Sequence, residues 1–275
     1  MLKRLQTRRS RVPIVSLIGL ILLASVVVLA GCGGGGGTIT TAGSTTVQPV
    51  AEKLAGAFMA DHPEVGIDVM GGGSSTGVKS CNDGTVDIGM ASREIKPSEP
   101  NLVKHMLARD GIAIAVHKDV PVSDLTMEQI RGIFSGAITN WNEVGGDDAD
   151  IIVVAREEGS GTRAAFEEMV MDEELIVNTA ILQPSNGAVK TTVANTPNSI
   201  GFLSFGYLDG SVKALAVDGV AGSVENAKAS TYPIVRPLYF LTKEQPTGIV
   251  KDFIDFCLGA EGQSIVEDEG YLSVQ

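Results

Sequence analysis

A short glycine- and hydroxyl-rich segment, Gly159-Ser160-Gly161-Thr162, lies between an apolar β-like run and a helical pattern. Backbone N–H groups in the first turn of a helix have no partners within the helix, and the positive end of the helix dipole lies there. An anion can bind at such a place without a metal ion or a lysine. Ser160 and Thr162 add hydroxyl donors, and Arg156, just upstream, adds a planar cation suited to oxyanions. We therefore expect this segment to form one wall of an anion-binding site.

Two earlier segments of the chain repeat this pattern. Residues 42–47, with the sequence AGSTTV, and residues 71–77, with the sequence GGGSSTG, each lie between a β-like run and a helical pattern. One such segment is explained well by an ordinary loop that ends in a helix N-cap. Three in one chain favour a shared binding role over packing alone. The hydroxyl-bearing residues that they add to the candidate site are Ser44, Thr45, Thr46, Ser74 and Ser75.

The elements that position these loops alternate between short β-like runs and helical patterns, which is typical of a mostly parallel α/β sheet. Strands are expected at residues 38–41, 66–70, 86–90, 111–117, 151–155, 200–205, 212–217 and 234–242. Helices are expected at residues 50–62, 75–82, 100–108, 125–135, 189–195, 248–257 and 262–269, with a further helix start at residues 160–162. A fourth polar loop, which contains Ser92 and Arg93, follows the strand at residues 86–90.

Two of the apolar runs, residues 112–117 and 234–241, are interpreted as crossings between two α/β domains. The C-terminal helices would then return to the first domain. In open α/β sheets, ligands bind beyond the carboxyl ends of the strands, and two such ends that face each other form a cleft. The first domain supplies the two earlier loops and Ser92, and the second supplies Arg156 and the segment after it. We therefore expect four loops to face one ligand.

The first 31 residues have the pattern of an export signal. Five basic residues precede an almost entirely apolar run at residues 12–30. The sequence LAGC that follows resembles a lipobox, the signal for lipidation of a cysteine and cleavage just before it. We expect a signal peptide at residues 1–31, lipidation of Cys32 and a glycine tether at residues 32–37, which together would hold the protein at the outer face of a membrane. The alternative is that residues 12–30 remain as an uncleaved anchor.

The composition narrows the function further. The net charge is −12 at pH 7, and removal of the five basic residues of the signal peptide leaves −17. Such a surface repels nucleic acid, and it also repels the proposed anion, so the site must act through local dipoles and Arg156. Cys81 and Cys257 either form a disulfide or remain as two buried thiols. The three histidines are scattered, and we predict no metal ion and no cofactor.

Two enzyme classes share parts of these motifs. Residues 72–80, GGSSTGVKS, nearly match the phosphate-binding loop of P-loop NTPases, but Val78 separates the glycine from Lys79. A serine hydrolase would use Ser160 or Ser74 as its nucleophile. Neither serine lies in a GxSxG motif, and no histidine is close to either one in the sequence. Both enzyme classes are therefore weaker alternatives, and we expect no catalytic residues.

The blocks AGSTTV, GGGSSTG, VDIGMASREI, IFSGAITNWNEVGG, AREEGSGTR and SIGFLSFGY occur in this order along the chain. Together they resemble the phosphate-binding lipoproteins of high-affinity phosphate ABC importers, and the resemblance covers essentially all of the chain after Cys32. It implies a type II periplasmic-binding-protein fold of the α/β class, in which two mixed sheets are joined by two hinge strands. Lobe I is then expected at residues 38–115 and 238–275, and lobe II at residues 116–237.

The resemblance also implies a function. The expected protein is a monomeric extracytoplasmic receptor that captures inorganic phosphate between its lobes and delivers it to an ABC permease, without catalysing a reaction. The phosphate contacts carried over by motif are Thr45, Thr46, Ser74, Arg156, Ser160, Gly161 and Thr162, and we place Ser44, Ser75 and Ser92 beside them. Glu158 is expected to hold the arginine, and Arg93 is expected to support the site.

One departure from the family pattern concerns ligand selectivity. Well-known members carry an aspartate after the strand that corresponds to residues 86–90, where it accepts the proton of hydrogen phosphate and rejects sulfate. Here the sequence at that place is ASRE. Ser92 can donate and accept a hydrogen bond, whereas Arg93 can only donate. We expect phosphate selectivity to be retained, with Glu94 or Glu158 as the candidate acceptor, and the alternative is a receptor for sulfate, molybdate or tungstate.

Overall fold

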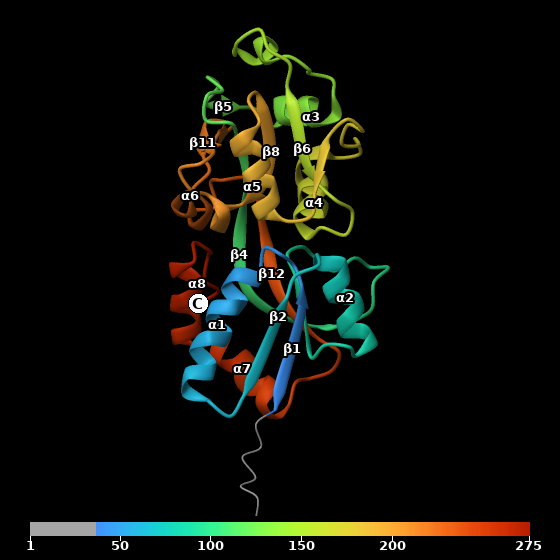
Figure 1. Ribbon diagram of the computed structural model, residues 1–275, viewed down its shortest axis with the longest axis vertical. Helices are drawn as coiled ribbons and strands as arrows, with labels where there is room; N and C mark the ends of the chain where they lie inside the picture. The colour runs from blue at the N-terminus through green and yellow to red at the C-terminus, as the bar shows by residue number, and fades with distance from the viewer. Residues whose placement is uncertain (1–36) are drawn as a thin grey trace, which may run out of the picture. The chain divides into compact units, whose positions relative to one another are not determined.

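The computed structural model of the protein describes residues 37–275 (Figure 1). The expected signal peptide, the lipidation site Cys32 and the glycine tether up to residue 36 lie outside the described residues. Within residues 37–275, no helix is both long enough and apolar enough to cross a membrane. A mixed sheet of nine strands and a small sheet of three strands organise this part of the chain.

The first half of the main sheet carries the two early loops. Its strands and the helices that follow them are β1 (Thr38–Gly43), α1 (Gln48–Asp61), β2 (Gly66–Met70), α2 (Ser74–Asp83) and β3 (Ile88–Ala91). β1 lies between β2 and β3 and is parallel to both. Because the three strands are parallel, their carboxyl ends meet at the same edge of the sheet. The segments that follow the three strands are therefore neighbours, as the sequence predicts.

Two strands connect this half of the sheet to the other half. They are β4 (Val103–Val116) and β12 (Val235–Thr242), which pair antiparallel. β4 pairs with β12 up to Gly111, and from Ile112 onward it pairs with β8 (Ser199–Ser204). The expected helix at residues 100–108 is wrong, because the ladder with β12 begins at Val103 and overrides the local helical pattern.

The second half of the main sheet carries Arg156 and the loop after it. Its strands, besides β8 and the end of β4, are β6 (Ile152–Arg156), β7 (Ile181–Gln183) and β9 (Lys213–Ala214). Its helices are α3 (Met127–Ser135), α4 (Gly161–Phe166), α5 (Asn186–Asn195) and α6 (Val224–Lys228). Single turns of 3₁₀-helix lie at η1 (Trp141–Val144) and η3 (Phe205–Tyr207), and a π-helical turn, η2 (Glu167–Met171), continues α4.

The strand expected at residues 212–217 is split into two short strands. β9 pairs with β4, whereas β10 (Ala216–Val217) turns away and joins the small sheet with β5 (Asp124–Leu125) and β11 (Val220–Ala221). Between them, Leu215 N–H donates to the carbonyl of Ile114 at 2.8 Å. The apolar run is therefore shared between two sheets, which its sequence does not reveal.

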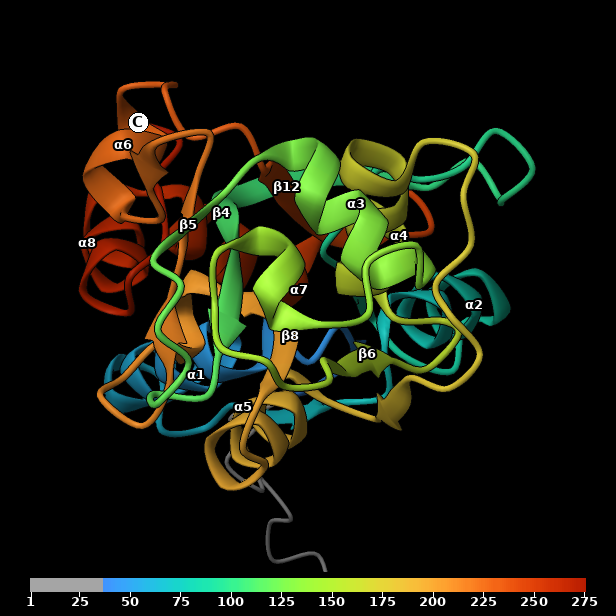
Figure 2. The ribbon, with the colours of Figure 1, turned by 90° about the horizontal axis from the view of Figure 1, so that it is seen from above.

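Helices cover both faces of the second half because alternate strand residues point to opposite sides. Val153 and Ala155 of β6 pack into the core that contains Phe134 and Phe166, whereas Val154 packs with Val189 of α5. Seen from above, α5 lies on one side of β6 and β8, and α3 and α4 lie on the other (Figure 2).

Each half has its own apolar core. In the first, Phe58 and Phe253 pack with ring centroids 5.3 Å apart, and in the second, Phe166 stacks on Phe202 at 4.1 Å. We call the half with β1–β3 lobe I and the half with β6–β9 lobe II. α7 (Gly248–Leu258) and α8 (Ala260–Asp268) pack beside α1 in lobe I (Figure 1). The two-lobed α/β fold expected from the sequence is confirmed, and the boundaries at residues 115 and 237 stay a prediction.

The sequence leaves open whether two cysteines form a disulfide, and the fold shows where they lie. Cys81 and Cys257 are both buried, and they are not joined in the described chain. Burial raises the pKa of each thiol. Both cysteines are therefore apolar core residues in lobe I rather than a cross-link.

Candidate functional site

The loops singled out in the sequence lie together at the junction of the two lobes. The N–H of Ser75, from lobe I, donates to the carbonyl of Gly159, from lobe II, at 3.1 Å. A second contact between the lobes runs from Arg156 Nη2 to the hydroxyl of Thr45 at 3.3 Å. Since the first pair is 84 positions apart in the sequence and the second pair is separated by 111, the fold itself creates the site.

The first loop is shaped by its own backbone. The hydroxyl oxygen of Ser44 accepts the N–H groups of Thr46 at 3.2 Å and Val47 at 3.3 Å, and so orders the turn that precedes α1. Gly43 precedes it with φ of 139°, a conformation that favours glycine. A Cβ atom at Gly43 would lie 2.3 Å from the carbonyl oxygen of Met90. Glycine is therefore required for β1 to lie against β3 at this edge.

The two lobes pack tightly against each other at Gly161, the first residue of α4. A Cβ atom there would lie 2.1 Å from the hydroxyl oxygen of Ser74 and 2.5 Å from that of Ser92. These two serines are themselves joined, because Ser92 N–H donates to Ser74 Oγ at 3.0 Å. Both are essentially buried, at 0% and 1% exposure. Ser74, Ser92 and Gly161 thus form one contact region, as the sequence predicts.

Arg156 lies at the end of β6 with its side chain buried. Its Nε donates to the carbonyl of Gln183 at 3.1 Å, and its Nη2 donates to the carbonyl of Pro184 at 2.8 Å. Burial, and to a smaller extent the nearby guanidinium of Arg236, lower the pKa of Arg156 to about 10. Arg156 therefore remains a cation at neutral pH, fixed by backbone carbonyls.

The expectation that Glu158 holds Arg156 is wrong. Glu158 is exposed, and no ion pair between the two is found within residues 37–275. The guanidinium instead turns toward the end of the neighbouring strand β7, where the carbonyls of Gln183 and Pro184 accept from it. The consequence is electrostatic, since no carboxylate of the described chain forms an ion pair with Arg156.

Arg93 is also buried, but its charge is compensated. Nη1 and Nη2 of Arg93 donate to the two carboxylate oxygens of Glu99 at 2.8 Å and 2.7 Å, in the forked geometry typical of arginine. Nη2 also reaches Ser75 Oγ at 3.3 Å. Glu94, one candidate acceptor, instead accepts from Tyr239 at 2.7 Å and pairs with Lys104. Arg93 therefore supports the lobe I wall and does not add free charge.

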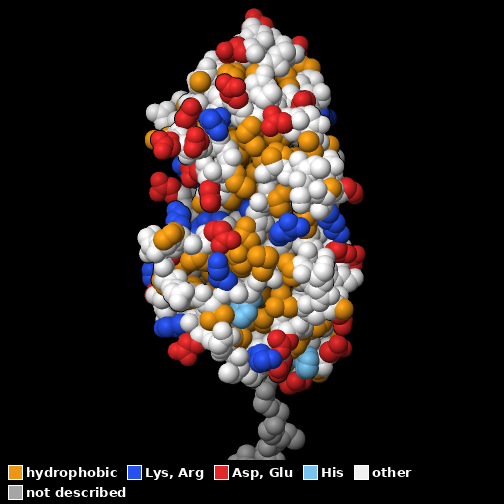
Figure 3. Space-filling model, turned by 180° about the vertical axis from the view of Figure 1, so that it is seen from behind, with side chains coloured by type: hydrophobic (Ala, Val, Ile, Leu, Met, Phe, Trp, Pro, Cys, Tyr) orange, Lys and Arg blue, Asp and Glu red, His pale blue; other side chains and the backbone are white. Residues whose placement is uncertain are grey.

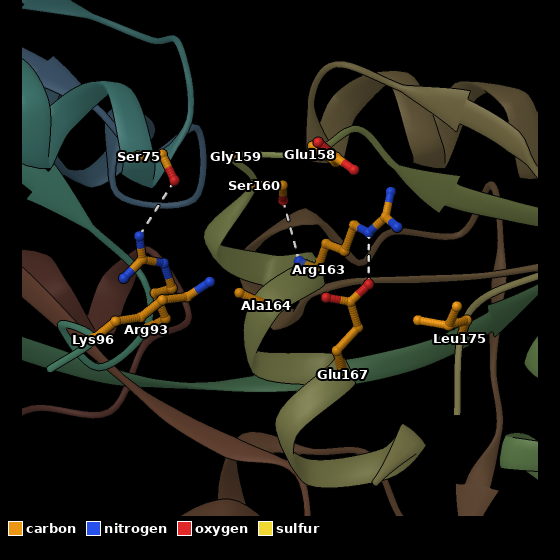
Figure 4. A pocket seen from close by; sticks show the side chains of 10 residues that line it. All are labelled: Ser75, Arg93, Lys96, Glu158, Gly159, Ser160, Arg163, Ala164, Glu167 and Leu175. Atoms are coloured by element: carbon orange, nitrogen blue, oxygen red, sulfur yellow. Dashed lines mark hydrogen bonds and ion pairs between the residues drawn. The ribbon is translucent and has the colours of Figure 1, made fainter. Parts of the chain in front are cut away.

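A pocket of about 360 Å³ opens between the loops (Figure 4). Arg93 and Lys96 approach it from lobe I, and Ser160 and Arg163 approach it from lobe II. Ser75 is exposed at this mouth, whereas Ser160 is 5% exposed and accepts the N–H of Arg163 through its hydroxyl oxygen. The pocket is a polar entrance to the junction, next to the buried serines and threonines.

A second group of buried polar residues was missed by the sequence reasoning. It consists of Asp110, Asn186, Ser204 and Arg236, all at 2% exposure or less. Arg236 Nε and Nη2 donate to Asp110 Oδ2 at 3.1 Å and 2.8 Å. Burial raises the pKa of Asp110, while the arginine opposes that shift. The signal in the sequence was partial, since Arg236 is the one charged residue of β12 but Asp110 is one of several charged residues of β4, and nothing in the sequence marks Asn186.

The enzyme alternatives gain no support from the geometry. Lys79 lies exposed on α2 and pairs with Asp83, so it does not face the junction of the lobes. Neither Ser74 nor Ser160 is hydrogen-bonded to a histidine within residues 37–275. What the arrangement offers is a set of hydroxyl and N–H donors around one guanidinium. Such a set suits the binding of a small oxyanion.

Comparison with known proteins supports this interpretation. Residues 30–261 match the model of the PBP superfamily domain. The phosphate-binding protein PstS of Bacillus subtilis is 38% identical over 241 residues, which cover 86% of this chain and 80% of that protein. The chain belongs to the PstS family. The family expected from the sequence blocks is thereby confirmed.

Solved structures of this family have the same fold. A phosphate ABC transporter substrate-binding protein from Clostridium perfringens, determined with bound phosphate, is 44% identical and superposes with a TM-score of 0.84 over 86% of this chain and all of that one. A phosphate transport receptor from Vibrio cholerae is 37% identical, with a TM-score of 0.73 over 85% of this chain and 99% of that one.

Proposed function

We propose that the protein is an extracytoplasmic receptor that captures inorganic phosphate at the junction of its lobes and delivers it to an ABC permease. The observation that carries this proposal is the buried Arg156 of lobe II, which has no carboxylate partner within residues 37–275 and donates to the Thr45 hydroxyl of lobe I. The names of the relatives support the choice of phosphate, since PstS proteins and the Clostridium perfringens structure are described as phosphate-binding.

The charges of the site suit an anion. Of the three buried arginines near the junction, Arg93 is paired with Glu99, and Arg236 is paired with Asp110. Only Arg156 contributes a net positive charge. A bound phosphate would exchange its water shell for this guanidinium and for hydroxyl and N–H donors, each of which forms a charge-assisted bond. For a receptor of micromolar affinity, these bonds less the cost of desolvation must leave about −8 kcal/mol.

We assign the ligand contacts to Arg156 and to the residues whose hydroxyls or backbone line the junction. These are Ser44, Thr45, Thr46, Ser74, Ser75, Ser92, Ser160, Gly161 and Thr162, with Arg93 in support. Capture occurs by closure of lobe I, residues 38–115 and 238–275, on lobe II, residues 116–237. No bond is made or broken.

Selectivity against sulfate needs an acceptor for the proton of hydrogen phosphate. Glu94 is engaged by Tyr239 and Lys104, and Glu158 lies at the pocket mouth. The hydroxyl of Ser92, which can accept as well as donate, is the acceptor closest to the place of the missing aspartate. We therefore expect selectivity for phosphate to rest on hydroxyls, and sulfate, molybdate or tungstate remain the alternative ligands.

Calorimetric titration of the purified protein with phosphate, arsenate, sulfate and molybdate tests the proposal. Tight binding of phosphate with no heat from sulfate at the same concentration is the expected result. Equal binding of sulfate would assign the protein to general oxyanion capture. Turnover of a chromogenic phosphate ester that disappears in Ser160→Ala would instead show a hydrolase.

The cellular setting follows from the N-terminal sequence. We propose cleavage after residue 31, lipidation of Cys32 and function as a membrane-anchored monomer. The intact mass of the protein from its native membrane distinguishes a lipidated form that begins at Cys32 from an uncleaved chain.

A further inference from the structure

A buried chain of hydrogen bonds leads from the two connecting strands to Thr162. It begins at Asp110 of β4. Asp110 Oδ1 accepts from the Ser204 hydroxyl at 2.9 Å and from the N–H of Phe205 at 3.2 Å. Asp110 Oδ2 accepts Nε and Nη2 of Arg236. Four donors occupy the carboxylate and leave no lone pair for a proton, so Asp110 is held as an anion and holds Arg236 in one orientation.

The chain continues through Thr46, whose hydroxyl oxygen has two fixed donors. Arg236 Nη2 donates to it at 3.0 Å, and Asn186 Nδ2 donates to it at 2.8 Å. The amide orientation of Asn186 is determined by its other end, because Asn186 Oδ1 accepts the backbone N–H of Ser204 at 3.3 Å. A hydroxyl oxygen accepts at most two hydrogen bonds. The hydroxyl proton of Thr46 must therefore be donated to a group other than Arg236 and Asn186.

The acceptor for that proton is Thr162. The hydroxyl oxygens of Thr46 and Thr162 are 3.2 Å apart and both residues are 1% exposed. Once Thr162 accepts from Thr46, its own proton is free for another partner. Within the described chain its acceptor is Asn186 Oδ1 at 3.5 Å, a long contact that a bound anion at ordinary hydrogen-bond distance would replace. Thr162 follows Gly161 at the start of α4, where the two lobes are tightly packed.

We propose that Arg236, Asn186 and Thr46 are positioning residues that make Thr162 an obligate donor to the bound anion. In place of the ligand contact assigned to Thr46 above, its hydroxyl then acts only through Thr162. This inference rests on the proposed phosphate-binding function and names the residues that orient one of its contacts. Arg236 sets the direction of the hydrogen bonds, since its Nη2 can only donate to the Thr46 hydroxyl.

The relay also joins the lobes. Thr46 belongs to the loop between β1 and α1 in lobe I, whereas Asn186 and Thr162 belong to α5 and α4 in lobe II. A role as a simple latch between the lobes makes a different prediction from a role in orienting Thr162. If Thr46 is a latch, its loss weakens binding whether or not Thr162 has a hydroxyl. If Thr46 orients Thr162, its loss weakens binding only when that hydroxyl is present.

A double-mutant cycle on phosphate affinity separates the two roles. Thr162→Val should weaken binding about 10- to 100-fold, the range for loss of one hydrogen bond to a charged group. Thr46→Val should weaken binding about 10-fold, because the Thr162 hydroxyl loses its fixed direction. In the double variant the loss of phosphate affinity should match that of Thr162→Val within about twofold. Thr46→Ser, which keeps the hydroxyl, should bind phosphate with the affinity of the wild type.

The matched control is Thr41→Val, a buried threonine of β1 whose hydroxyl has only a weak contact with the Met90 sulfur at 4.0 Å. It should leave the affinity unchanged. Losses that multiply in the double variant, or no loss in Thr46→Val, would overturn the relay. Should Thr46→Val fail to fold by circular dichroism, Thr46→Ala gives the same cycle. If the wild-type protein binds no phosphate, the proposed function itself fails. If it binds phosphate but the two losses of affinity multiply in the double variant, only the relay fails.

Discussion

At the scale of single residues, the site is defined by how each arginine is held. Arg93 and Arg236 are each paired with a buried or half-buried carboxylate, whereas Arg156 is held by the carbonyls of Gln183 and Pro184. A carbonyl fixes the orientation of a guanidinium without cancelling its charge. The sequence predicts Arg156 from its position after an apolar strand. It cannot predict which arginines are neutralised, because the partners come from distant elements.

Arg156→Met should weaken phosphate binding by about 100-fold or more, because it removes the one uncompensated buried cation and at least two charge-assisted bonds. Titration calorimetry measures the effect. The control is Arg131→Met, which removes an arginine of α3 that also donates to a carbonyl, that of Val170 at 2.8 Å. Arg131→Met should bind as the wild type does. Equal affinity in both variants would remove Arg156 from the site.

At the scale of elements, the loops were easier to predict than the strands that carry them. Glycine and hydroxyl residues identified all three strand-to-helix loops, since their chemistry is local. The helix expected at residues 100–108 fails because pairing with β12, more than 100 residues away, determines the conformation of β4. Asp110 within β4 and Arg236 within β12 were missed for a related reason, since each is a charge whose partner only the fold supplies.

Gly161→Ala tests whether α4 must start in contact with lobe I. The added Cβ would lie 2.1 Å from Ser74 Oγ, so the lobes could not close as they do here. We expect a loss of phosphate affinity of at least about 10-fold, from about 1 to 3 kcal/mol of overpacking. Gly56→Ala in α1 is the control, because nothing lies within 4 Å of its added Cβ. That variant should bind normally and unfold at a slightly higher temperature.

The ion pair between Arg93 and Glu99, in the loop after β3, should make the stability of the protein depend on pH. Burial raises the pKa of Glu99, but hydrogen bonds from Arg93 and from the N–H of Lys96 outweigh it, so the pKa lies below its ordinary value of 4.5. The pair therefore contributes stability that is complete above pH 4.5 and is lost as the pH falls through the lowered pKa.

Glu99→Gln should lower the free energy of unfolding at pH 7 by about 2 kcal/mol, because Arg93 stays buried without its partner. Urea denaturation from pH 7 to pH 3 measures this. The difference from the wild type should shrink toward the acid end, where Glu99 is protonated in both the folded and unfolded protein. Glu244→Gln, a change at an exposed loop residue, is the control and should show no such dependence. A constant difference across the range would contradict the pairing.

At the scale of the whole molecule, the net charge does not favour binding of an anion. The chain carries a net charge of −12, and the face shown in Figure 3 mixes acidic and basic side chains, with Lys and Arg side chains at mid-height. The pocket lining is also mixed, because Arg163 pairs with Glu167 and Arg93 pairs with Glu99. The charge that attracts an anion is therefore the local one of the buried Arg156. The two-lobed α/β class was predictable from the alternation of strands and helices, whereas the contacts between the lobes were not.

Tyr207→Phe should shift the balance between open and closed lobes. The Tyr207 hydroxyl, from lobe II, donates to the carbonyl of Thr45 at 2.6 Å, and burial raises its pKa to about 12, so it stays a donor at neutral pH. Its loss should weaken phosphate affinity about fivefold through faster release, measured by stopped-flow fluorescence of a labelled protein. The matched control is Tyr232→Phe, because the Tyr232 hydroxyl also donates to a carbonyl, that of Ile112 at 2.8 Å. This variant should lower the stability of the protein but not its affinity for phosphate.

The single tryptophan offers a consequence for spectroscopy. Trp141 is 1% exposed in the core of lobe II, and its indole N–H donates to the carbonyl of Asn198 at 2.9 Å. Under excitation that is selective for tryptophan over the four tyrosines, the emission of the native chain therefore has one source, shielded from water and confined to one lobe. A red shift during denaturation would follow the melting of that lobe alone, and any lag behind circular dichroism would reveal that the two halves come apart in separate steps.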